Sequence, residues 1–295
     1  MQVRETWLAP LRGVTIRAFR EAFSGPIAEA GFAGAFAPFI PANPGIRVND
    51  RMLEDLRPFP NEGKGGRFEL VPQVISKDPA SMRVLLKGLK ERGFTRADLN
   101  AGCPFPMIRR RGRGSGLFRT PETLARLLEA GCEEMGPGRF SLKIRLGLER
   151  ADELKALLPL VNGFPLAVLT VHARTAVQMY EGDCDRAAFE EVAARSSNPV
   201  MYNGDVAFPC AEAPSARAMI GRSFVRALGE RADSAELLRR YIELSRSELP
   251  GERPVLGRMK ELLAYWCAAP RWRGVWSAVK ICRTVDELLM VVRSV

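Results

Sequence analysis

The stretch FELVPQVISKDPASMRVLLKGLKERGFTRADLNA, residues 68–101, places an amphipathic segment between two short apolar runs. The runs at residues 68–75 and 97–101 have the length and composition of buried parallel strands. The segment between them, residues 79–92, begins at Asp78-Pro79, where a capping side chain precedes a proline at the first helical position. Residues 68–101 therefore predict a strand–helix–strand unit, the building block of parallel α/β folds.

The same alternation continues along most of the chain. We expect further strands at residues 6–10, 32–38, 140–146, 167–172, 199–203 and 216–220, and further helices at residues 121–134, 151–160 and 186–195. About eight strand–helix repeats within roughly 225 residues suit a (β/α)8 TIM barrel better than a doubly wound sheet.

The pattern changes after Gly229, where helices are expected at residues 234–247, 254–267, 272–279 and 285–292 with no strands between them. We therefore expect a catalytic barrel domain at residues 1–230 and a small helical domain at residues 231–295. The second segment carries 12 basic and 8 acidic side chains, which is a denser positive charge than in the rest of the chain. A module that docks on a polyanion would have this charge, and so would a solvated helical face.

The composition is that of a globular enzyme, with 46% apolar and 26% charged residues among 295. The excess of 44 Lys+Arg over 34 Asp+Glu favours a polyanionic partner, either a nucleic acid or an anionic membrane surface. None of the six cysteines forms a C-x-x-C pair, which predicts a reducing, cytoplasmic compartment rather than a zinc or disulfide framework. No stretch has the form of a signal peptide or a membrane span, so we expect no membrane association.

Chemically active residues gather where the predicted strands end. In a barrel, the carboxyl ends of the strands carry the active site. The residues at these ends are Gln73, Asn100, Cys103, Lys143, Arg145, His172, Arg174, Asn203, Gly204, Asp205, Gly221 and Arg222.

A thiol stands on the corner Gly102-Cys103-Pro104, directly after a strand. Glycine permits a tight backbone path and proline stiffens the next step, so the corner would hold Cys103 over the barrel mouth. A free cysteine is also commonly a small buried apolar residue. We interpret the glycine-rich segment after it as a mobile loop that neutralises phosphates, with a solvated loop as the alternative. Its basic side chains are Arg109, Arg110, Arg111 and Arg113.

Strand alternation sends Lys143 and Arg145 to the same side, into the barrel, where two cations are costly unless they meet an anion. His172 is the only histidine, so a His-rich metal centre is excluded and we expect no metal. Loops after the seventh and eighth strands of barrels commonly bind phosphate, and here they carry Asn203-Gly204-Asp205 and Gly221-Arg222. These loops predict a phosphate-bearing cofactor, and neither a G-x-G-x-x-G motif nor a P-loop supports a Rossmann or triphosphate site.

These motifs together resemble those of the tRNA-dihydrouridine synthases over nearly the whole chain. The segment 8–15, LAPLRGVT, is similar to the opening strand and turn of that family, and 99–104, LNAGCP, to its catalytic loop. Lys143-Ile144-Arg145, the segment 171–174 (VHAR), Asn203-Gly204-Asp205 and Ile220-Gly221-Arg222 follow in the family's order and spacing. The tail Gly257-Arg258-Met259-Lys260 is similar to the DusC branch.

The resemblance implies an FMN- and NADPH-dependent enzyme that reduces a uridine of tRNA to 5,6-dihydrouridine. It implies cofactor contacts from Pro10, Leu11, Arg12, Gln73, Lys143, His172, Asn203, Gly204, Asp205, Gly221 and Arg222. A hydride would pass from the flavin to carbon 6 of uracil while Cys103 protonates carbon 5 on the other face. Such a mechanism needs the thiol to face the cofactor across a slot one pyrimidine thick, and a sulfur that is buried or turned away from the cleft would contradict it.

For the RNA, the resemblance implies a monomeric tRNA-binding protein in which Asn100 contacts the uracil. The basic side chains expected to bind substrate are Arg109, Arg110, Arg111, Arg113, Arg145, Arg174, Arg258 and Lys260.

The sequence also departs from the family pattern. Leu11 stands where Met is usual, Arg12 where a small or acidic residue is common, and Ala173 where Gly is usual. Residues 205–219 are shorter than a usual strand–helix–strand connection by about half a helix. Two prolines fall within residues 207–215, so the seventh barrel helix is expected to be short or missing.

Two other functions fit parts of this pattern. A different FMN barrel oxidoreductase that reduces small pyrimidines or enones would explain the cofactor residues but not the four-arginine loop. A catalytically inactive tRNA-binding relative would be consistent with the short 205–219 segment.

Overall fold

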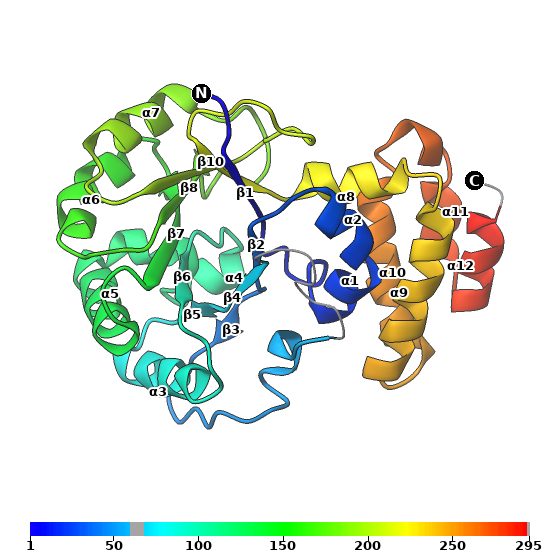
Figure 1. The fold of residues 1–295 in the computed structure, drawn as a ribbon, viewed down its shortest axis with the longest axis horizontal. Helices are drawn as coiled ribbons and strands as arrows, with labels where there is room; N and C mark the ends of the chain where they lie inside the picture. Colours follow the sequence, from blue (N-terminus) through cyan, green and yellow to red (C-terminus); the bar gives the residue numbers. More distant parts are fainter. Residues whose placement is uncertain (60–67, 294–295) are drawn as a thin grey trace.

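Figure 1 shows the computed structural model, which describes residues 1–59 and 68–293: a barrel of parallel strands followed by a group of helices. Six strands are continuous: β1 (Glu5–Leu8), β6 (Ala97–Ala101), β7 (Phe140–Gly147), β8 (Leu169–Thr175), β9 (Val200–Asn203) and β10 (Arg217–Ile220). Two further strands are interrupted, because β2 (Gly34–Phe36) resumes as β3 (Ile40–Pro41) and β4 (Glu69–Val71) resumes as β5 (Gln73–Ile75).

The sheet closes on itself. Its order is β3-β5-β6-β7-β8-β9-β10-β1-β2-β4, and each of these neighbouring strands pairs in parallel. Since β2 pairs with β4 and β3 pairs with β5, the two interrupted strands lie next to each other at both ends of this order. Within residues 1–59 and 68–293 the strands therefore form a closed barrel of eight, which confirms the predicted TIM-barrel class.

Each interruption falls at a proline. Pro72 separates β4 from β5, and Pro38 lies between β2 and β3. Proline has no backbone N–H and cannot donate to the ladder, although Pro72 still accepts a hydrogen bond from the backbone N–H of Asp98 at 2.9 Å. The ladder is broken at these points without opening the barrel.

Helices cover the outside of the barrel (Figure 1). They are α1 (Arg17–Ala22), α2 (Ser24–Glu29), α3 (Pro79–Lys90), α5 (Pro121–Met135), α6 (Glu153–Asn162), α7 (Arg186–Arg195) and α8 (Arg222–Gly229). Four of them were predicted from the sequence with ends within two residues. The predicted start at Asp78-Pro79 is confirmed, because the Asp78 carboxylate accepts a hydrogen bond from the backbone N–H of Ser81 at 3.0 Å.

Two of the expected strand–helix units depart from the regular pattern. Between β3 and β4, the described residues contain only the 3-10 turn η1 (Glu54–Leu56). No helix forms between β9 and β10, all of whose connecting residues are described, so the prediction of a short or missing seventh helix is confirmed. The amino-terminal residues lie along this connection instead, with Gln2 bridged to Glu212 and the Val3 N–H bonded to the Ala211 carbonyl at 3.0 Å.

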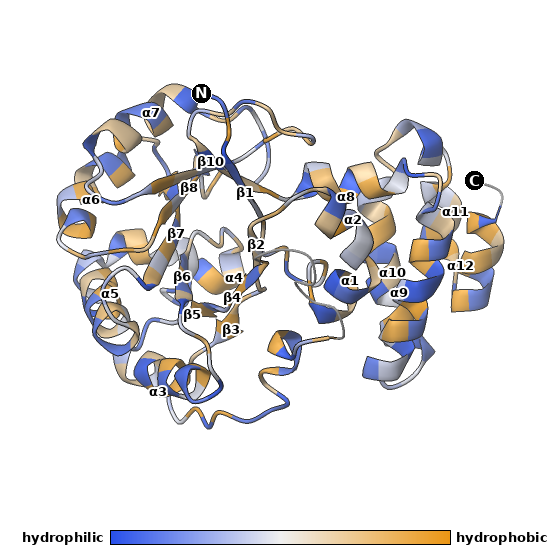
Figure 2. Cartoon of the chain, viewed as in Figure 1, coloured by the Kyte–Doolittle hydropathy of each residue, from blue (hydrophilic) through white to orange (hydrophobic). Residues whose placement is uncertain are grey.

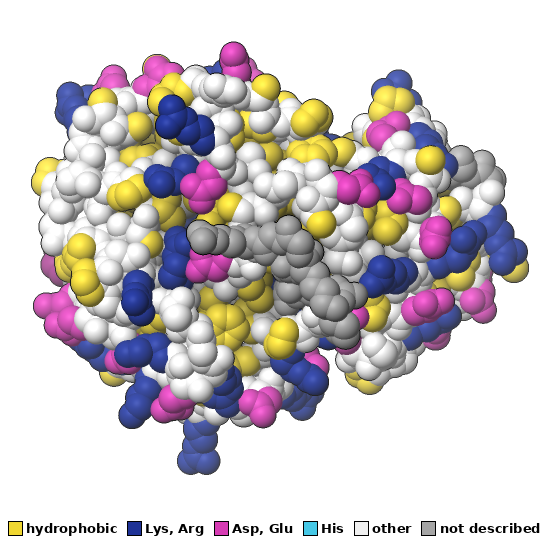
Figure 3. All heavy atoms as spheres, viewed as in Figure 1, with side chains coloured by type: hydrophobic (Ala, Val, Ile, Leu, Met, Phe, Trp, Pro, Cys, Tyr) yellow, Lys and Arg dark blue, Asp and Glu magenta, His cyan; other side chains and the backbone are white. Residues whose placement is uncertain are grey.

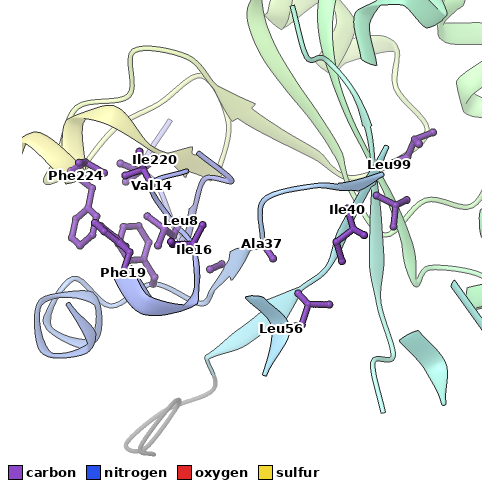
Figure 4. Close-up of a cluster of buried hydrophobic side chains, with 14 of the residues drawn as sticks. Leu8, Val14, Ile16, Phe19, Ala37, Ile40, Leu56, Leu99, Ile220 and Phe224 are labelled. Carbon is purple, nitrogen blue, oxygen red and sulfur yellow. The ribbon is translucent and has the colours of Figure 1, made fainter. Parts of the chain in front are cut away.

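Buried apolar side chains form two layers. One cluster fills the inside of the barrel and consists of Trp7, Ala9, Phe36, Val71, Val168, Met201 and Met219. The larger cluster lies between the strands and the helices, and Figure 4 shows part of it, with Leu8, Val14 and Ile220 beside Phe19 and Phe224. The helices show hydrophobic and hydrophilic residues along the same segment, as amphipathic covering helices do (Figure 2).

Up to residue 293, four α-helices follow the barrel: α9 (Ser234–Glu248), α10 (Glu252–Trp266), α11 (Trp276–Ile281) and α12 (Val285–Val292). They stand on one side of it (Figure 1), and α9 packs against α1 while α10 packs against α8. Tyr241 lies 6.1 Å from Phe19 and 5.7 Å from Phe23 between ring centroids, so an aromatic cluster joins both parts. The division into domains at residue 230 stays a prediction.

Basic and acidic side chains are interspersed over the barrel and these helices on the face in Figure 3. In the described part of the chain, no helix is both long enough and apolar enough to cross a bilayer.

Two helical glycines provide a test of the packing. A methyl group at Gly131 in α5 would come within 2.1 Å of the Phe140 ring, whereas one at Gly257 in α10 meets nothing within 4 Å. We expect Gly131→Ala to lower the free energy of unfolding by about 1–3 kcal/mol through overpacking. The control Gly257→Ala should raise it by about 0.5–1 kcal/mol. Urea denaturation measures both, and equal effects would contradict the described contact between α5 and β7.

Candidate active site

The carboxyl ends of the strands surround a cavity of about 1300 Å³ at the barrel mouth. Many of the predicted site residues line it: Pro10, Leu11, Arg12, Asn100, Cys103, Arg110, Arg111, Lys143, Arg145, His172 and Arg222. A second cavity of about 470 Å³ adjoins it and is lined by Asn203, Gly204, Asp205 and Gly221. Pro10, Leu11, Lys143, His172 and Arg222 border both cavities. Barrel closure thus brings together residues from both ends of the sequence.

Cys103 borders the larger cavity, with only 7% of its surface exposed. Its backbone is held on two sides: the N–H donates to Asn100 Oδ1 at 2.9 Å, and the carbonyl accepts from the Ser115 N–H at 3.1 Å and hydroxyl at 2.9 Å. Gly114, at φ +55°, allows this return of the chain, because a Cβ there would lie 2.8 Å from that of Cys103. The expectation for the thiol is therefore met in part: Cys103 borders the cleft, but it is buried, which counts against the mechanism, and its catalytic role stays a prediction.

The segment after Cys103 folds into a short helix, α4 (Pro106–Arg109), and a 3-10 helix, η2 (Gly114–Arg119). Arg110 and Arg111 face the larger cavity, whereas Arg109 and Arg113 line neither cavity. Phe105 and Met107 are exposed on the cavity side, at 44% and 69%. The rim beside the thiol therefore combines apolar and basic side chains, of which the sequence analysis had singled out only the arginines.

Burial decides the protonation of Cys103. It raises the pKa of the thiol above 9.0 and outweighs the opposing effect of the cations Arg12, Arg145 and Lys143. A thiol with this pKa carries its proton at neutral pH, which is the state that a proton donor requires.

Three side chains on β5 and β6 form a hydrogen-bonded row inside the barrel. Gln73 Nε2 donates to Asp98 Oδ2 at 2.7 Å, and Asn100 Nδ2 donates to Gln73 Oε1 at 2.7 Å. Burial raises the pKa of Asp98 to about 7, against the hydrogen bond from Gln73 and the charge of Lys143. The sequence analysis missed Asp98, although the alternation within residues 97–101 puts it on the same face as Asn100.

Lys143 and Arg145 both face the cavity, as their spacing on the strand predicts. Lys143 Nζ donates to Asn203 Oδ1 at 2.9 Å, and burial together with Arg145 lowers the pKa of Lys143 to about 8. Arg145 is 1% exposed and donates to the carbonyls of Gly102 at 2.9 Å and Thr175 at 2.8 Å. Arg145 therefore ties the Cys103 loop to the loop after β8.

His172 is buried in the middle of β8, which runs three residues beyond the strand end predicted from the sequence, and it lies beside four cations. Burial and the charges of Arg145, Lys143, Arg174 and Arg222 hold its pKa well below 6.5, so the ring is neutral. Arg174 Nη1 lies 3.4 Å from Nε2 of the ring. Because a guanidinium only donates, this nitrogen is the acceptor.

Asp205 lies between two arginines. It forms ion pairs with Arg174 and, at 3.0 Å, with Arg222. Its φ of +46° follows the +118° of Gly204, a turn that brings the carboxylate back toward β8. Arg222 is the first residue of α8, which no side chain caps at Gly221, so the helix amino terminus opens on the smaller cavity. This end of the site favours an anion.

The structure adds residues that the sequence analysis missed. Tyr180 borders both cavities, and the guanidinium carbons of Arg145 and Arg222 lie 5.4 and 4.9 Å from its ring centroid. Glu261 and Tyr265 of α10 line the larger cavity from the carboxyl-terminal helices. None of these residues directly follows a predicted strand, so the sequence pattern did not indicate them. Tyr180 is unusual for an aromatic side chain in being 42% exposed, but exposure cannot be read from a sequence.

Four other predicted residues lie away from the two cavities. Gln73 is fully buried behind Asn100, and Arg174 is 2% exposed behind His172. Arg258 pairs with Glu248 at 2.9 Å, and Lys260 Nζ donates to the carbonyls of Lys280 at 2.7 Å and Cys282 at 2.6 Å. Arg258 and Lys260 thus hold the helical segment together rather than face the site. Among residues 1–59 and 68–293, no group of three or more His, Cys, Asp or Glu could hold a metal ion.

A closed parallel barrel with a thiol, cations and an uncapped helix amino terminus at its carboxyl mouth defines the TIM-barrel fold class. The sequence model of the dihydrouridine synthase family matches residues 7–224, and the chain belongs to that family. This finding confirms the family expected from the motifs.

Several curated relatives are named tRNA-dihydrouridine synthase B. That of Vibrio cholerae is 28% identical over 207 residues, covering 68% of this chain and 60% of the relative. That of Serratia marcescens is 28% identical over 261 residues, covering 86% and 73%. The chain thus spans about 60% of the length of the first of these relatives. The DusC branch stays a prediction.

Solved structures share the fold at low identity. Morphinone reductase superposes with a TM-score of 0.51 at 13% identity, covering 76% of this chain and 83% of the other. An old yellow enzyme homologue from Zymomonas mobilis gives 0.52 at 12% identity, covering 76% and 86%. These likenesses support the barrel class and nothing finer.

The raised pKa of Cys103 predicts a slow reaction with iodoacetamide at pH 7, because the thiolate is the nucleophile. The rate at Cys103 should rise through and beyond pH 9, and it should stay below that of the same cysteine in the urea-denatured chain. Mass spectrometry of the alkylated peptide measures both rates. Full reactivity at pH 7 in the folded protein would contradict the described burial.

Proposed function

We propose that the protein reduces a uridine of tRNA to 5,6-dihydrouridine, with FMN as cofactor, NADPH as reductant and Cys103 as proton donor. The observation that carries the proposal is the place of Cys103: in a chain of the dihydrouridine synthase family, its protonated thiol borders the same cavity as Asn100, Lys143 and His172.

The chemistry of the smaller cavity fits a flavin mononucleotide. The uncapped amino terminus of α8 and the guanidinium of Arg222 suit its phosphate, with Asn203, Gly204, Asp205 and Gly221 around it. Lys143 is a half-buried cation whose hydrogen bond goes to the neutral amide of Asn203, so it can also meet an electron-rich ring edge. FMN, when bound, supplies the hydride for carbon 6 of uracil.

The isoalloxazine ring of FMN would lie over the strand ends that border both cavities. Pro10, Leu11 and Arg12 would line it from the end of β1, and His172, which is neutral, would lie beside it without adding a further positive charge. Gln73 is fully buried, so it would act on the flavin ring only through its hydrogen bond with Asn100.

Cys103 delivers the proton to carbon 5 of the uracil. A thiol held protonated by burial can give its proton to the carbon as the hydride arrives on the opposite face. Asn100, whose amide lies between Gln73 and the Cys103 backbone, is the proposed contact for the base. Because both groups lie inside the cavity, the target base must leave the folded RNA to reach them.

Basic side chains at the mouth suit the RNA backbone. Arg12, Arg110, Arg111 and Arg226 line the large cavity, and Arg145 and Arg174 stand deeper, bonded to protein groups. The net charge of +10 adds long-range attraction for a polyanion. We propose that residues 231–295 form a domain that docks on the tRNA. We also propose that the protein acts as a monomer in the cytoplasm.

The first test is colour and product. Purified protein should be yellow from bound flavin and should form dihydrouridine in unmodified tRNA. Cys103→Ala should keep the flavin and lose activity by about 10²–10⁴-fold, the usual contribution of a general acid. Cys267→Ala, which removes a thiol of the carboxyl-terminal helices, is the matched control and should keep both. A wild-type protein that remains colourless in excess FMN, or Cys103→Ala with full activity, would overturn the proposal.

The second test concerns the RNA contacts. Arg110→Ala and Arg111→Ala should each weaken tRNA binding and reduce the slope of log affinity against log salt concentration by about 1. Arg126→Ala, on the outer face of α5, should leave the slope unchanged. Fluorescence anisotropy with labelled tRNA at several salt concentrations gives the slopes. Equal slopes in all three variants would place the RNA elsewhere.

A further inference from the structure

We propose that Asp98 is a positioning residue, which orients a chain of two side-chain amides and thereby fixes the backbone of Cys103. This inference deepens the proposed function, because it concerns the thiol that the function uses. Asp98 does not touch the cavity, so its role would be exerted through Gln73 and Asn100.

The row of hydrogen-bonded side chains runs without a break from β5 to the loop that carries Cys103. Gln73 and Asp98 are register partners on neighbouring strands, so their side chains meet inside the barrel. Gln73 Nε2 donates to Asp98 Oδ2, and Asn100 Nδ2 donates to Gln73 Oε1, both at 2.7 Å. Asn100 Oδ1 then accepts from the backbone N–H groups of Cys103 at 2.9 Å and Gly102 at 3.2 Å.

The direction of the chain is set at its Asp98 end. A side-chain amide has one acceptor oxygen and one donor nitrogen. Asp98 Oδ2 is an acceptor in the ionised carboxylate, and it is also an acceptor in the neutral acid when the proton is on Oδ1. Asp98 therefore turns the nitrogen of Gln73 toward itself and the oxygen toward Asn100. Asn100 must then point its own nitrogen at Gln73 and its oxygen at the loop. Reversal of Asn100 would set its nitrogen against the N–H groups of Gly102 and Cys103. Reversal of Gln73 would set its oxygen against Asp98 and its nitrogen against that of Asn100.

The position of Asp98 is costly, which favours a function for it. Its side chain is fully buried, and Asp98 Oδ1 has no hydrogen-bond partner in the described part of the chain. Burying an unpartnered oxygen costs free energy that an apolar residue of similar size would avoid. Gln73 is also fully buried and Asn100 is 9% exposed, so water does not substitute freely for these contacts.

The hydrogen-bonded row of Asp98, Gln73 and Asn100 holds only the N–H side of Cys103. The Cys103 carbonyl is held separately by Ser115, and Arg145 also holds the loop by donating to the Gly102 carbonyl. Loss of Asp98 should therefore loosen the N–H side of the corner without releasing the whole loop. Such a change would alter the orientation of the Cys103 thiol more than it alters the binding of cofactor or RNA.

Hydrogen exchange tests the inference directly. In Asp98→Leu, which removes the acceptor, the amides of Gly102 and Cys103 should exchange about tenfold faster, the factor that follows from losing a hydrogen bond of roughly 1.4 kcal/mol. Asp98→Asn keeps a side-chain oxygen for Gln73 and should recover most of the protection. Val74→Ala, a buried truncation on the neighbouring strand β5, is the control for general loosening of the barrel and should leave these two amides at the wild-type rate.

Turnover gives the second readout. Asp98→Leu should lower kcat on tRNA by at least about tenfold, with KM for tRNA and flavin content kept, and Asp98→Asn should restore it in part. If Asp98→Leu does not fold, Asp98→Ala also removes the acceptor and takes its place.

The two proposals can fail separately. Wild-type exchange rates at Gly102 and Cys103 in Asp98→Leu would overturn the positioning role even in an active enzyme. Faster exchange in a protein that forms no dihydrouridine would support the positioning role and overturn the proposed function.

Discussion

Closure of the parallel barrel is the constraint on which the site depends. The two interrupted strands pair at both ends of the sheet order, β2 with β4 and β3 with β5, and this pairing bends the sheet into a ring. All carboxyl ends then face one mouth, so Pro10 and Arg222 border the same cavities although they are more than two hundred residues apart in the sequence. The absence of a helix between β9 and β10, a fully described connection, does not break the ring, because backbone pairing of the strands closes it.

Charge burial gives the mouth its chemistry. Lys143, Arg145, Arg174 and Arg222 converge there, and the acids near them are Asp98 inside the barrel and Asp205 at its rim. In a region of low polarity, the charged form of each group is costly unless a partner meets it. The same burial therefore lowers the pKa of Lys143, keeps His172 neutral and keeps the proton on Cys103. An arrangement of this kind suits an anionic, electron-rich ligand and a proton donor in one cavity.

The carboxyl-terminal helices take part in the site. Tyr241 and Trp266 pack on Phe23 of the barrel's first helical segment, which fixes α9 and α10 against the barrel. α10 then presents Glu261 and Tyr265 to the larger cavity, opposite the strand ends. Gly13 accommodates this approach, since a Cβ there would lie 2.4 Å from the Glu261 carboxylate. The predicted contribution of this segment was positive charge, but Arg258 and Lys260 bond within it, and what reaches the cavity is an acid and an aromatic ring.

Periodicity in the sequence is enough to determine most strands, most covering helices and the place of Cys103 just after a strand, because alternation and helix starts are local properties. It also put Lys143 and His172 on strands that face the barrel mouth, although β7 and β8 continue beyond them. It also indicated the missing seventh helix, since two prolines and a short connection leave no room for one. The tertiary structure alone decided which of these residues meet. Local alternation puts Asp98 on the same strand face as Asn100, but only strand register brings it to Gln73. Tyr180 and Glu261 reach the cavity through a turn after β8 and through helix docking, which have no local signature. The protonation of the thiol likewise depends on burial by residues distant in the chain, which no local pattern encodes.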